Sequence, residues 1–347
     1  MRAVVTERQG TPVALNVSYR TDWPDAHRPG PGHVMVRTLA SALNQMDLWV
    51  GRGVPGLELE YPRISGCDAC GVVEALGDDV EGAWLDQRVI VNAAIAQPQR
   101  VVPDDPPARH QAPEYELIGE HHSGMLASHF LAPVESLAPV GQNADPTQAA
   151  AFGLCHLTAY SMLVTKAQCG PGQTVLIAGI GGGLATAALD IARYLGCRVA
   201  VTSRHQWKLD KAGALGAELR VLDKGQDWSK EVRAWTQKRG VDVVVDSVGK
   251  PVHLSCLKSL ARGGAYVTPG CTGGHDPTTD LRRIFWNQLR ILGSTMGTKR
   301  EFDEIAALFR AGRLRAAVDR VFPAAQASEA FARLEAGEQC GKIVLTW

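Results

Sequence analysis

The stretch TVLIAGIGGGLATAALDIARYLGCRVAVTSRHQWK, residues 174–208, decides the fold. Its first five residues form an apolar run that predicts a buried strand, and the pattern over 184–195 predicts a helix. A second β-branched run follows at 199–202. Between the first strand and the helix lies a turn that contains Gly179, Gly181, Gly182 and Gly183. The order strand, glycine turn, helix, strand predicts the start of a dinucleotide-binding βαβ unit, because glycines let the backbone approach a pyrophosphate at the helix N-terminus.

We therefore expect these four glycines and Leu184 to contact a dinucleotide; the alternative is a glycine-rich turn without a ligand. The end of the second strand predicts which dinucleotide binds. An NAD site usually has an Asp or Glu there, which accepts hydrogen bonds from the ribose 2′-hydroxyl. This chain has Ser203 and Arg204, with Lys208 one turn further on. Because a hydroxyl, a guanidinium and an ammonium bind a 2′-phosphate, the sequence favours NADP(H) over NAD(H).

Length and composition limit the remaining possibilities. A chain of 347 residues suggests about two domains. Lys and Arg equal Asp and Glu at 36 each and are scattered, so no nucleic acid, membrane surface or polyanionic partner is expected. The N-terminus has no apolar signal sequence, and no long uncharged apolar stretch occurs. The eight cysteines form no tight framework, so we expect a reduced, cytoplasmic compartment.

The chain changes character near residue 150. From there to residue 294, six short strand patterns alternate with helical patterns, which predicts an α/β fold with a doubly wound parallel sheet. The first 140 residues hold short β-branched runs interrupted by Pro and Gly, typical of an irregular, mostly antiparallel β domain. The Pro-rich stretch 97–113 predicts a surface loop. A last strand pattern at 341–346 suggests that the chain returns to its first domain.

These features occur together with a series of motifs in a fixed order. They are ALNQMDLWVGRG (42–53), GCDACGVVEALGDDV (66–80), LTAYSML (157–163), the glycine turn, DSVG (246–249), DLRRIFWNQLRILGSTMGT (280–298) and GKIVL (341–345). In these motifs the chain resembles the medium-chain dehydrogenase/reductase superfamily, most closely its quinone-oxidoreductase-like and zinc-type alcohol-dehydrogenase-like branch. The resemblance implies a GroES-like catalytic domain at 1–145 with 300–347, a Rossmann domain at 146–299, and an active-site cleft at their junction.

The chain departs from the zinc enzymes of this superfamily at their metal ligands. Asn44 stands where they have a cysteine, Cys67 where they have a histidine, and the third ligand aligns near Leu154. Residues 91–119 contain no cysteine, so the four-thiolate structural zinc site cannot form there. We also expect no catalytic zinc. The alternative is an atypical site near Cys67, because ligand-type side chains remain at Cys67, Asp68, Cys70, Cys155 and His156.

Without a metal, a quinone or an α,β-unsaturated carbonyl is an easier hydride acceptor than a simple ketone, because conjugation spreads the arriving charge. Asn44 offers an amide donor for that charge, or else fixes the local backbone through an Asx-type turn. The resemblance places Asp47 and Trp49 beside the pocket, where Trp49 either stacks on a planar acceptor or packs in the core. We expect Asn44, Asp47, Trp49 and Cys67 to be the catalytic residues; the alternative for Cys67 is that it only lines the pocket. No general acid can be assigned.

The resemblance also implies further cofactor contacts. Thr158 matches a position beside the nicotinamide. Other expected contacts lie at the carboxyl ends of three strands: Val248, Gly270, Cys271, Ser294 and Met296. Lys342 lies where the superfamily often has a cofactor-contacting lysine, although we expect a solvated side chain there.

The sequence thus predicts an NADPH-dependent oxidoreductase that transfers hydride to a quinone or α,β-unsaturated carbonyl. The alternatives are an alcohol dehydrogenase with an atypical zinc site and a catalytically silent NADPH-binding sensor. We also expect a homodimer, because the superfamily commonly pairs its last Rossmann strand, here 290–294, with a second copy. The apolar residues Ile284, Phe285, Trp286 and Leu289 precede this strand. The alternative is that Phe285 and Trp286 pack on their own sheet.

Overall fold

The computed structural model describes residues 1–26, 28–96 and 115–347. The chain divides into two compact units. One, here called the discontinuous unit, comprises Met1–Leu154 and Thr298–Trp347, and the other, the central unit, comprises Cys155–Gly297. The surface loop predicted at 97–113 lies outside the described residues. Within the described part of the chain, no helix is long and apolar enough to cross a membrane.

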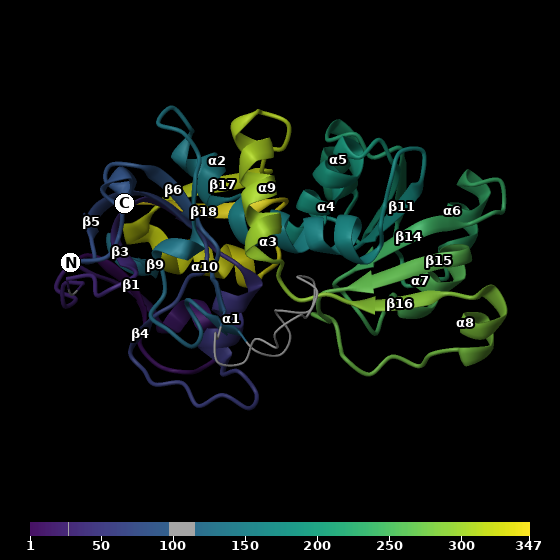
Figure 1. Ribbon diagram of the computed structural model, residues 1–347. Coiled ribbons are helices and arrows are strands. Elements are labelled where there is room, and N and C mark those ends of the chain that lie inside the picture. The colour runs from purple at the N-terminus through teal and green to yellow at the C-terminus, as the bar shows by residue number, and fades with distance from the viewer. Residues whose placement is uncertain (27, 97–114) are drawn as a thin grey trace. The chain divides into compact units, whose positions relative to one another are not determined.

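The central unit is built on a six-stranded parallel sheet (Figure 1). In spatial order its strands are β13 (Leu219–Leu222), β12 (Arg198–Ser203), β11 (Thr174–Ala178), β14 (Val241–Asp246), β15 (Leu260–Thr268) and β16 (Arg290–Gly293). The chain begins in the middle, at β11, and winds outward first to one side and then to the other. This arrangement confirms the doubly wound sheet and places a topological switch point at β11, where such sheets bind their ligands.

Helices connect these strands and cover the sheet. They are α4 (Gly183–Tyr194), α5 (Gln206–Ala214), α6 (Ser229–Trp235), α7 (His253–Ser259) and α8 (Leu281–Asn287). All five residues of β11 are buried, as their apolar sequence predicts. One boundary differs from prediction: the sequence pattern of residues 252–261 predicts a helix, but α7 ends at Ser259 and β15 already begins at Leu260. Leu260 pairs with Val241 before a shift in register, so the end of the predicted helix is part of the sheet instead.

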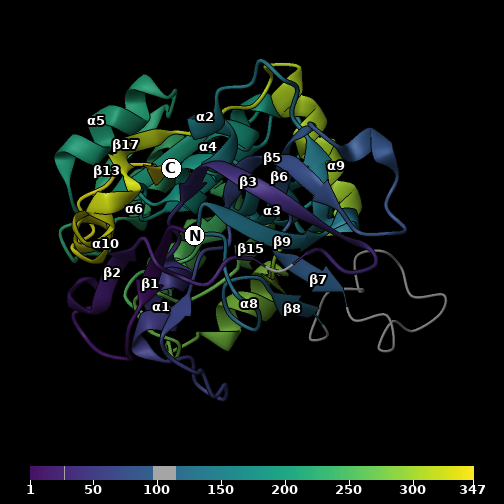
Figure 2. The same cartoon turned by 90° about the vertical axis from the view of Figure 1, so that its left-hand side faces the viewer.

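The discontinuous unit contains a mostly antiparallel seven-stranded sheet, seen in Figure 2 around the long strand β3. Its strand order is β10 (Leu137–Pro139), β6 (Arg88–Val91), β5 (Ala69–Leu76), β3 (His33–Ala42), β18 (Lys342–Thr346) and β17 (Val318–Pro323), with β9 (His129–Pro133) also on β3. A smaller sheet consists of β2 (Val17–Arg20), β1 (Ala3–Thr6) and β4 (Arg63–Ile64). These sheets confirm a GroES-like, mostly antiparallel unit beside a parallel one.

The pairing of β3 with β5 and β18 brings distant parts of the chain together. Ser41 of β3 pairs with Ala69 at the start of β5, and Ala42 pairs with Val344 of β18. The residues just outside these strand ends therefore meet at one edge of the sheet. Helix α1 (Gln45–Arg52) starts at the same edge, directly after β3.

Candidate functional site

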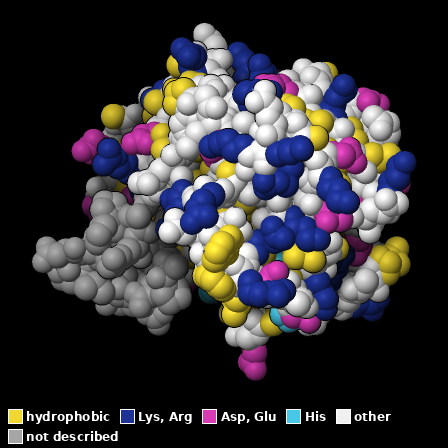
Figure 3. All heavy atoms as spheres, turned by 90° about the vertical axis from the view of Figure 1, so that its right-hand side faces the viewer, with side chains coloured by type: hydrophobic (Ala, Val, Ile, Leu, Met, Phe, Trp, Pro, Cys, Tyr) yellow, Lys and Arg dark blue, Asp and Glu magenta, His cyan; other side chains and the backbone are white. Residues whose placement is uncertain are grey.

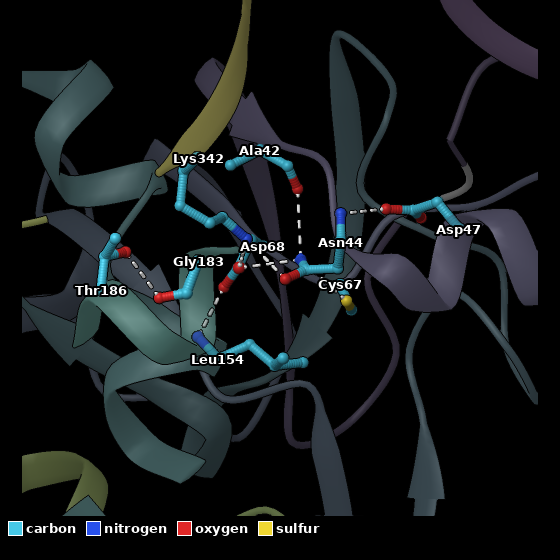
Figure 4. Close-up of polar contacts among 9 residues, drawn as sticks. All are labelled: Ala42, Asn44, Asp47, Cys67, Asp68, Leu154, Gly183, Thr186 and Lys342. Atoms are coloured by element: carbon cyan, nitrogen blue, oxygen red, sulfur yellow. Dashed lines mark hydrogen bonds and ion pairs between the residues drawn. The ribbon is translucent and has the colours of Figure 1, made fainter. Parts of the chain in front are cut away.

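Three polar side chains meet at this edge of the sheet, and we call them the Asp68 cluster: Asn44, Asp68 and Lys342 (Figure 4). The Lys342 ammonium lies 2.8 Å from Asp68 Oδ2 and also donates to the amide oxygen of Asn44. The Asn44 amide nitrogen donates to the same carboxylate oxygen at 2.9 Å. The other oxygen, Asp68 Oδ1, accepts the backbone N–H of Leu154 at 2.7 Å. Every oxygen of Asp68 is therefore hydrogen-bonded.

The cluster is almost completely removed from solvent. Asp68 is 1% exposed and Lys342 4%. The expectation of a solvated lysine at position 342 is therefore wrong. An ammonium can be buried here because a carboxylate and an amide oxygen replace its water. Neither charge would be tolerated at this depth without the other.

Two of the three family ligand positions, Asn44 and Leu154, contact the Asp68 carboxylate, and the third, Cys67, lies against Asn44. Asn44 Nδ2 lies 3.3 Å from Cys67 Sγ, and Leu154 contributes its backbone N–H. The side chains at these positions are thus an amide, a thiol and an aliphatic chain, which do not match the donor set of a tetrahedral zinc site. Across the described ranges no group of three or more His, Cys, Asp or Glu side chains could hold a metal ion. The pKa of the nearby Cys70 thiol is raised to about 12 by burial, as in an inert core thiol.

Helix α1 carries two further predicted site residues, Asp47 and Trp49. Asp47 is fully buried, and its Oδ2 accepts the backbone N–H of Asn44 at 2.7 Å. Burial raises the pKa of Asp47 to about 6, although this hydrogen bond and Lys342 oppose the shift. In the structure Asp47 thus fixes the start of α1 and the backbone of Asn44. Trp49 is 41% exposed, so it is not a core residue.

The glycine turn of the central unit has the features of a phosphate cradle. Helix α4 begins at Gly183, and no side chain caps its N-terminus. Gly181 has φ +142, and a Cβ there would lie 2.6 Å from Cδ of Lys208. At Gly179 (φ +71) a Cβ would lie 2.5 Å from a methyl of Val248. Only glycine fits these positions, and the uncapped helix terminus suits a pyrophosphate.

The residues after β12 supply positive charge beside this turn. The Lys208 side chain passes over Gly181, and its ammonium lies 5.2 Å from the centre of the Trp207 ring. Ser203 is buried at the end of β12, and its hydroxyl accepts the backbone N–H of His205 at 3.2 Å. Arg204 is exposed. The residues present therefore fit a dinucleotide with a charged group on its adenosine ribose.

The other predicted cofactor contacts follow the carboxyl ends of neighbouring strands. They are Val248 after β14, Gly270 and Cys271 after β15, and Ser294 and Met296 after β16. Because the strands are parallel, these residues lie on the same edge of the sheet as the glycine turn. Thr158 is buried in α3 (Gly153–Tyr160).

One residue that shapes this edge, Asp246, was not predicted from the sequence. Its carboxylate is buried at the end of β14 and accepts the Tyr266 hydroxyl at 2.6 Å. It also accepts the backbone N–H groups of Val248 at 2.7 Å and Gly249 at 3.1 Å. Asp246 thereby sets the turn that holds Val248 beside Gly179. The signal was visible in the motif DSVG, where a charged residue directly ends an apolar strand.

Two family models each match one part of the chain, and individual proteins match nearly all of it. Residues 30–142 match the family model described as alcohol dehydrogenase GroES-like domain, and residues 215–345 match the model described as zinc-binding dehydrogenase. The zinc-type alcohol dehydrogenase-like protein YogA of Leptosphaeria maculans is 28% identical over 331 residues, which cover 91% of each chain.

Two crystal structures also resemble the whole chain. One, of an NAD-dependent alcohol dehydrogenase, has 36% sequence identity and a TM-score of 0.92, with 100% of both chains covered. The other, of a thermostable alcohol dehydrogenase from Pyrobaculum aerophilum, has 27% identity and a TM-score of 0.86 and covers 100% of this chain and 99% of that one.

Proposed function

The chain belongs to the medium-chain dehydrogenase/reductase superfamily of oxidoreductases, and we propose that it is an NADPH-dependent, zinc-independent reductase of quinones or α,β-unsaturated carbonyls. The Asp68 cluster carries this proposal. The side-chain nitrogen of Lys342 is buried against the Asp68 carboxylate, which two of the three family ligand positions, Asn44 and Leu154, also contact. An additional divalent cation at this carboxylate would be repelled by the ammonium.

The chemistry of the acceptor follows from this electrostatic arrangement. Bound NADPH supplies a hydride from C4 of its nicotinamide. The residues of the cluster then have to stabilise the negative charge that reaches the acceptor oxygen. We propose that Lys342 supplies the positive charge for this role, since Asn44 and Asp68 fix the position of its side-chain nitrogen. A single ammonium is a weaker electrophile than a metal ion, which suits conjugated acceptors better than simple ketones. Water can protonate the resulting quinol anion or enolate.

The preference for NADPH rests on Arg204 and Lys208. No carboxylate directly follows β12 to accept hydrogen bonds from a ribose 2′-hydroxyl, and two cations stand within the next five residues. The similar protein named NAD-dependent alcohol dehydrogenase is described as using NAD instead. The residues of this chain support NADPH, because guanidinium and ammonium groups bind a doubly charged 2′-phosphate more tightly than an uncharged 2′-hydroxyl.

A panel of acceptors tests the proposal. We expect steady-state oxidation of NADPH with a benzoquinone or an enone, and little or none with a saturated ketone of similar size. Oxidation of a simple alcohol with NADP⁺ that exceeds quinone reduction would favour an alcohol dehydrogenase. Tight NADPH binding by the same preparation without turnover of any acceptor would favour a catalytically silent sensor.

A further inference from the structure

Two cysteines of the central unit lie side by side although they are 28 positions apart in the sequence. Cys169 lies in the loop before β11, and Cys197 lies between α4 and β12. Their sulfur atoms are 3.5 Å apart, and both are free thiols. A disulfide requires about 2.05 Å between the sulfurs, so they have to approach by roughly 1.5 Å.

The backbone around these thiols is already held together. The N–H of Gly172 donates to the carbonyl of Gly196 at 3.0 Å, and the N–H of Arg198 donates to the carbonyl of Gln173 at 2.9 Å. Next to them, β11 and β12 pair from Thr174 and Arg198 onward. The two segments therefore cannot drift apart, and small side-chain rotations suffice to bring the sulfurs together.

The two thiols are chemically unequal. Cys197 is partly exposed, and a hydrogen bond from Cys169 lowers the pKa of its thiol. Cys169 is buried, and the same hydrogen bond together with burial raises the pKa of its thiol. The nearby carboxylate of Asp242 disfavours both thiolates, but Arg239 pairs with it. Cys197 is thus the accessible nucleophile, and Cys169 is the partner that resolves its oxidised form.

We propose that Cys169 and Cys197 form a peroxide-sensitive modification site that closes to an intramolecular disulfide. Cys197 loses its proton to solvent, and its thiolate attacks one oxygen of hydrogen peroxide. The O–O bond breaks, a sulfenic acid forms on Cys197, and the released hydroxide takes up a proton to become water. The sulfur of Cys169 then attacks the sulfenic sulfur, the S–O bond breaks, and a second water leaves with the thiol proton. The two thiols lose two electrons and the peroxide gains two.

The bond would enclose β11, the glycine turn and α4. It would form near the amino ends of β11 and β12, whereas the glycine turn lies at their carboxyl ends. Oxidation therefore restrains the strand, turn and helix without occupying the dinucleotide site. A disulfide across a loop of this length typically stabilises a domain enough to raise its apparent Tm by about 5 °C or more.

Peptide mapping tests the proposal directly, because trypsin separates the two cysteines. Cleavage after Lys166, Arg193 and Arg198 leaves Cys169 in peptide 167–193 and Cys197 in peptide 194–198, each with no other cysteine. After treatment of the intact protein with equimolar hydrogen peroxide, we expect these two peptides to be joined and to separate again on reduction with dithiothreitol. Joined peptides from a monomer-sized band on a non-reducing gel establish a bond within one chain.

Single variants separate the roles of the two thiols. Cys169→Ser should accumulate a sulfenic acid on Cys197 that a dione reagent traps, whereas Cys197→Ser should leave Cys169 reduced. Neither variant should show the rise in Tm that peroxide gives the wild type. The proposal is wrong if both thiols stay alkylatable in wild-type protein whose exposed Cys271 has been oxidised.

Discussion

Arg204 and Lys208 decide the proposed choice of cofactor at the level of single residues. A charge-assisted hydrogen bond contributes about 1.5–3 kcal/mol, which corresponds to roughly tenfold or more in affinity. We expect Arg204→Ala to weaken NADPH binding by at least about tenfold and NADH binding far less. Lys211→Ala is the control, because Lys211 is a cation on α5, the helix that also carries Lys208, and its ammonium contacts Trp207 as that of Lys208 does. Equal losses for both cofactors in Arg204→Ala would contradict the assignment.

The buried carboxyl of Asp47 predicts a dependence of stability on pH. Its pKa is about 6 in the folded chain against 3.8 when unperturbed, so the folded state holds this proton more tightly. Its contribution to the free energy of unfolding is therefore fully present below pH 3.8 and falls by about 2–3 kcal/mol as the pH rises through 6. Asp47→Asn keeps an acceptor for the Asn44 N–H. Its free energy of unfolding should not fall in this way as the pH rises.

Urea unfolding of the wild type and Asp47→Asn at about pH 4.5 and about pH 7 measures the difference. The variant should gain stability relative to the wild type at the higher pH. A difference between the two proteins that stays constant across this range would show that Asp47 is not titrating there.

Single residues also show which features of the site the sequence predicts and which it does not. The ligand replacements at Asn44 and Cys67 are visible in the sequence, because the family resemblance supplies the ligand positions and only the residue type has to be read there. The burial of Lys342 is not, since its partners lie 274 and 298 positions away. The pairing of Cys169 with Cys197 is hidden for the same reason. Periodicity describes each segment by itself and does not say which segment ends meet.

At the level of elements, the Asp68–Lys342 pair connects the start of β18 to the start of β5. Removing one partner of a buried ion pair typically costs about 3–5 kcal/mol, because the other charge stays buried without compensation. We expect this loss for Lys342→Met and for Asp68→Asn. The double variant should lose clearly less than the sum of the two.

A surface ion pair with a similar nitrogen–oxygen distance provides the control. Lys258 and Asp227 lie 2.7 Å apart but are each about one-third exposed. Lys258→Met should therefore cost about 1 kcal/mol or less. Urea unfolding measures all four variants, and additive losses in the Asp68–Lys342 cycle would show that the pair is not coupled.

Elements whose sequence signal is local were predicted closely. The strand, glycine turn and helix of the dinucleotide unit need only an apolar run, four glycines and a helical period. The early start of β15 was missed because its first residues pair with Val241 through the sheet, which local periodicity does not report. The adjacency of β3, β5 and β18, which builds the Asp68 cluster, is likewise a property of the sheet.

The whole molecule presents an apolar surface at the edge of the central sheet. β16 is an edge strand, and on the adjoining helix α8 Phe285 is 66% and Trp286 69% exposed, with Leu281 and Ile291 exposed beside them. Hydrophobic side chains lie between Lys and Arg side chains on the face shown in Figure 3. Phe285 and Trp286 thus do not pack fully on their own sheet. We propose that a second copy of the chain covers them in a symmetric dimer.

Light scattering at micromolar concentration should give about twice the chain mass of 37.2 kDa. The double substitution Phe285→Ser and Trp286→Ser should shift the protein to a monomer. Leu15→Ser, which removes an apolar side chain that is 79% exposed in the other unit, should leave the dimer intact. A wild-type monomer would refute the proposal.

Zinc independence is the central claim, and metal content measured together with activity tests it most directly. Protein purified without added metal should contain far less than one zinc per chain. Its NADPH-driven reduction of a quinone and its Tm should be unchanged after dialysis against a strong chelator. Stoichiometric zinc that leaves together with the activity, and restores it when added back, would contradict the account and identify the protein as a zinc-dependent enzyme.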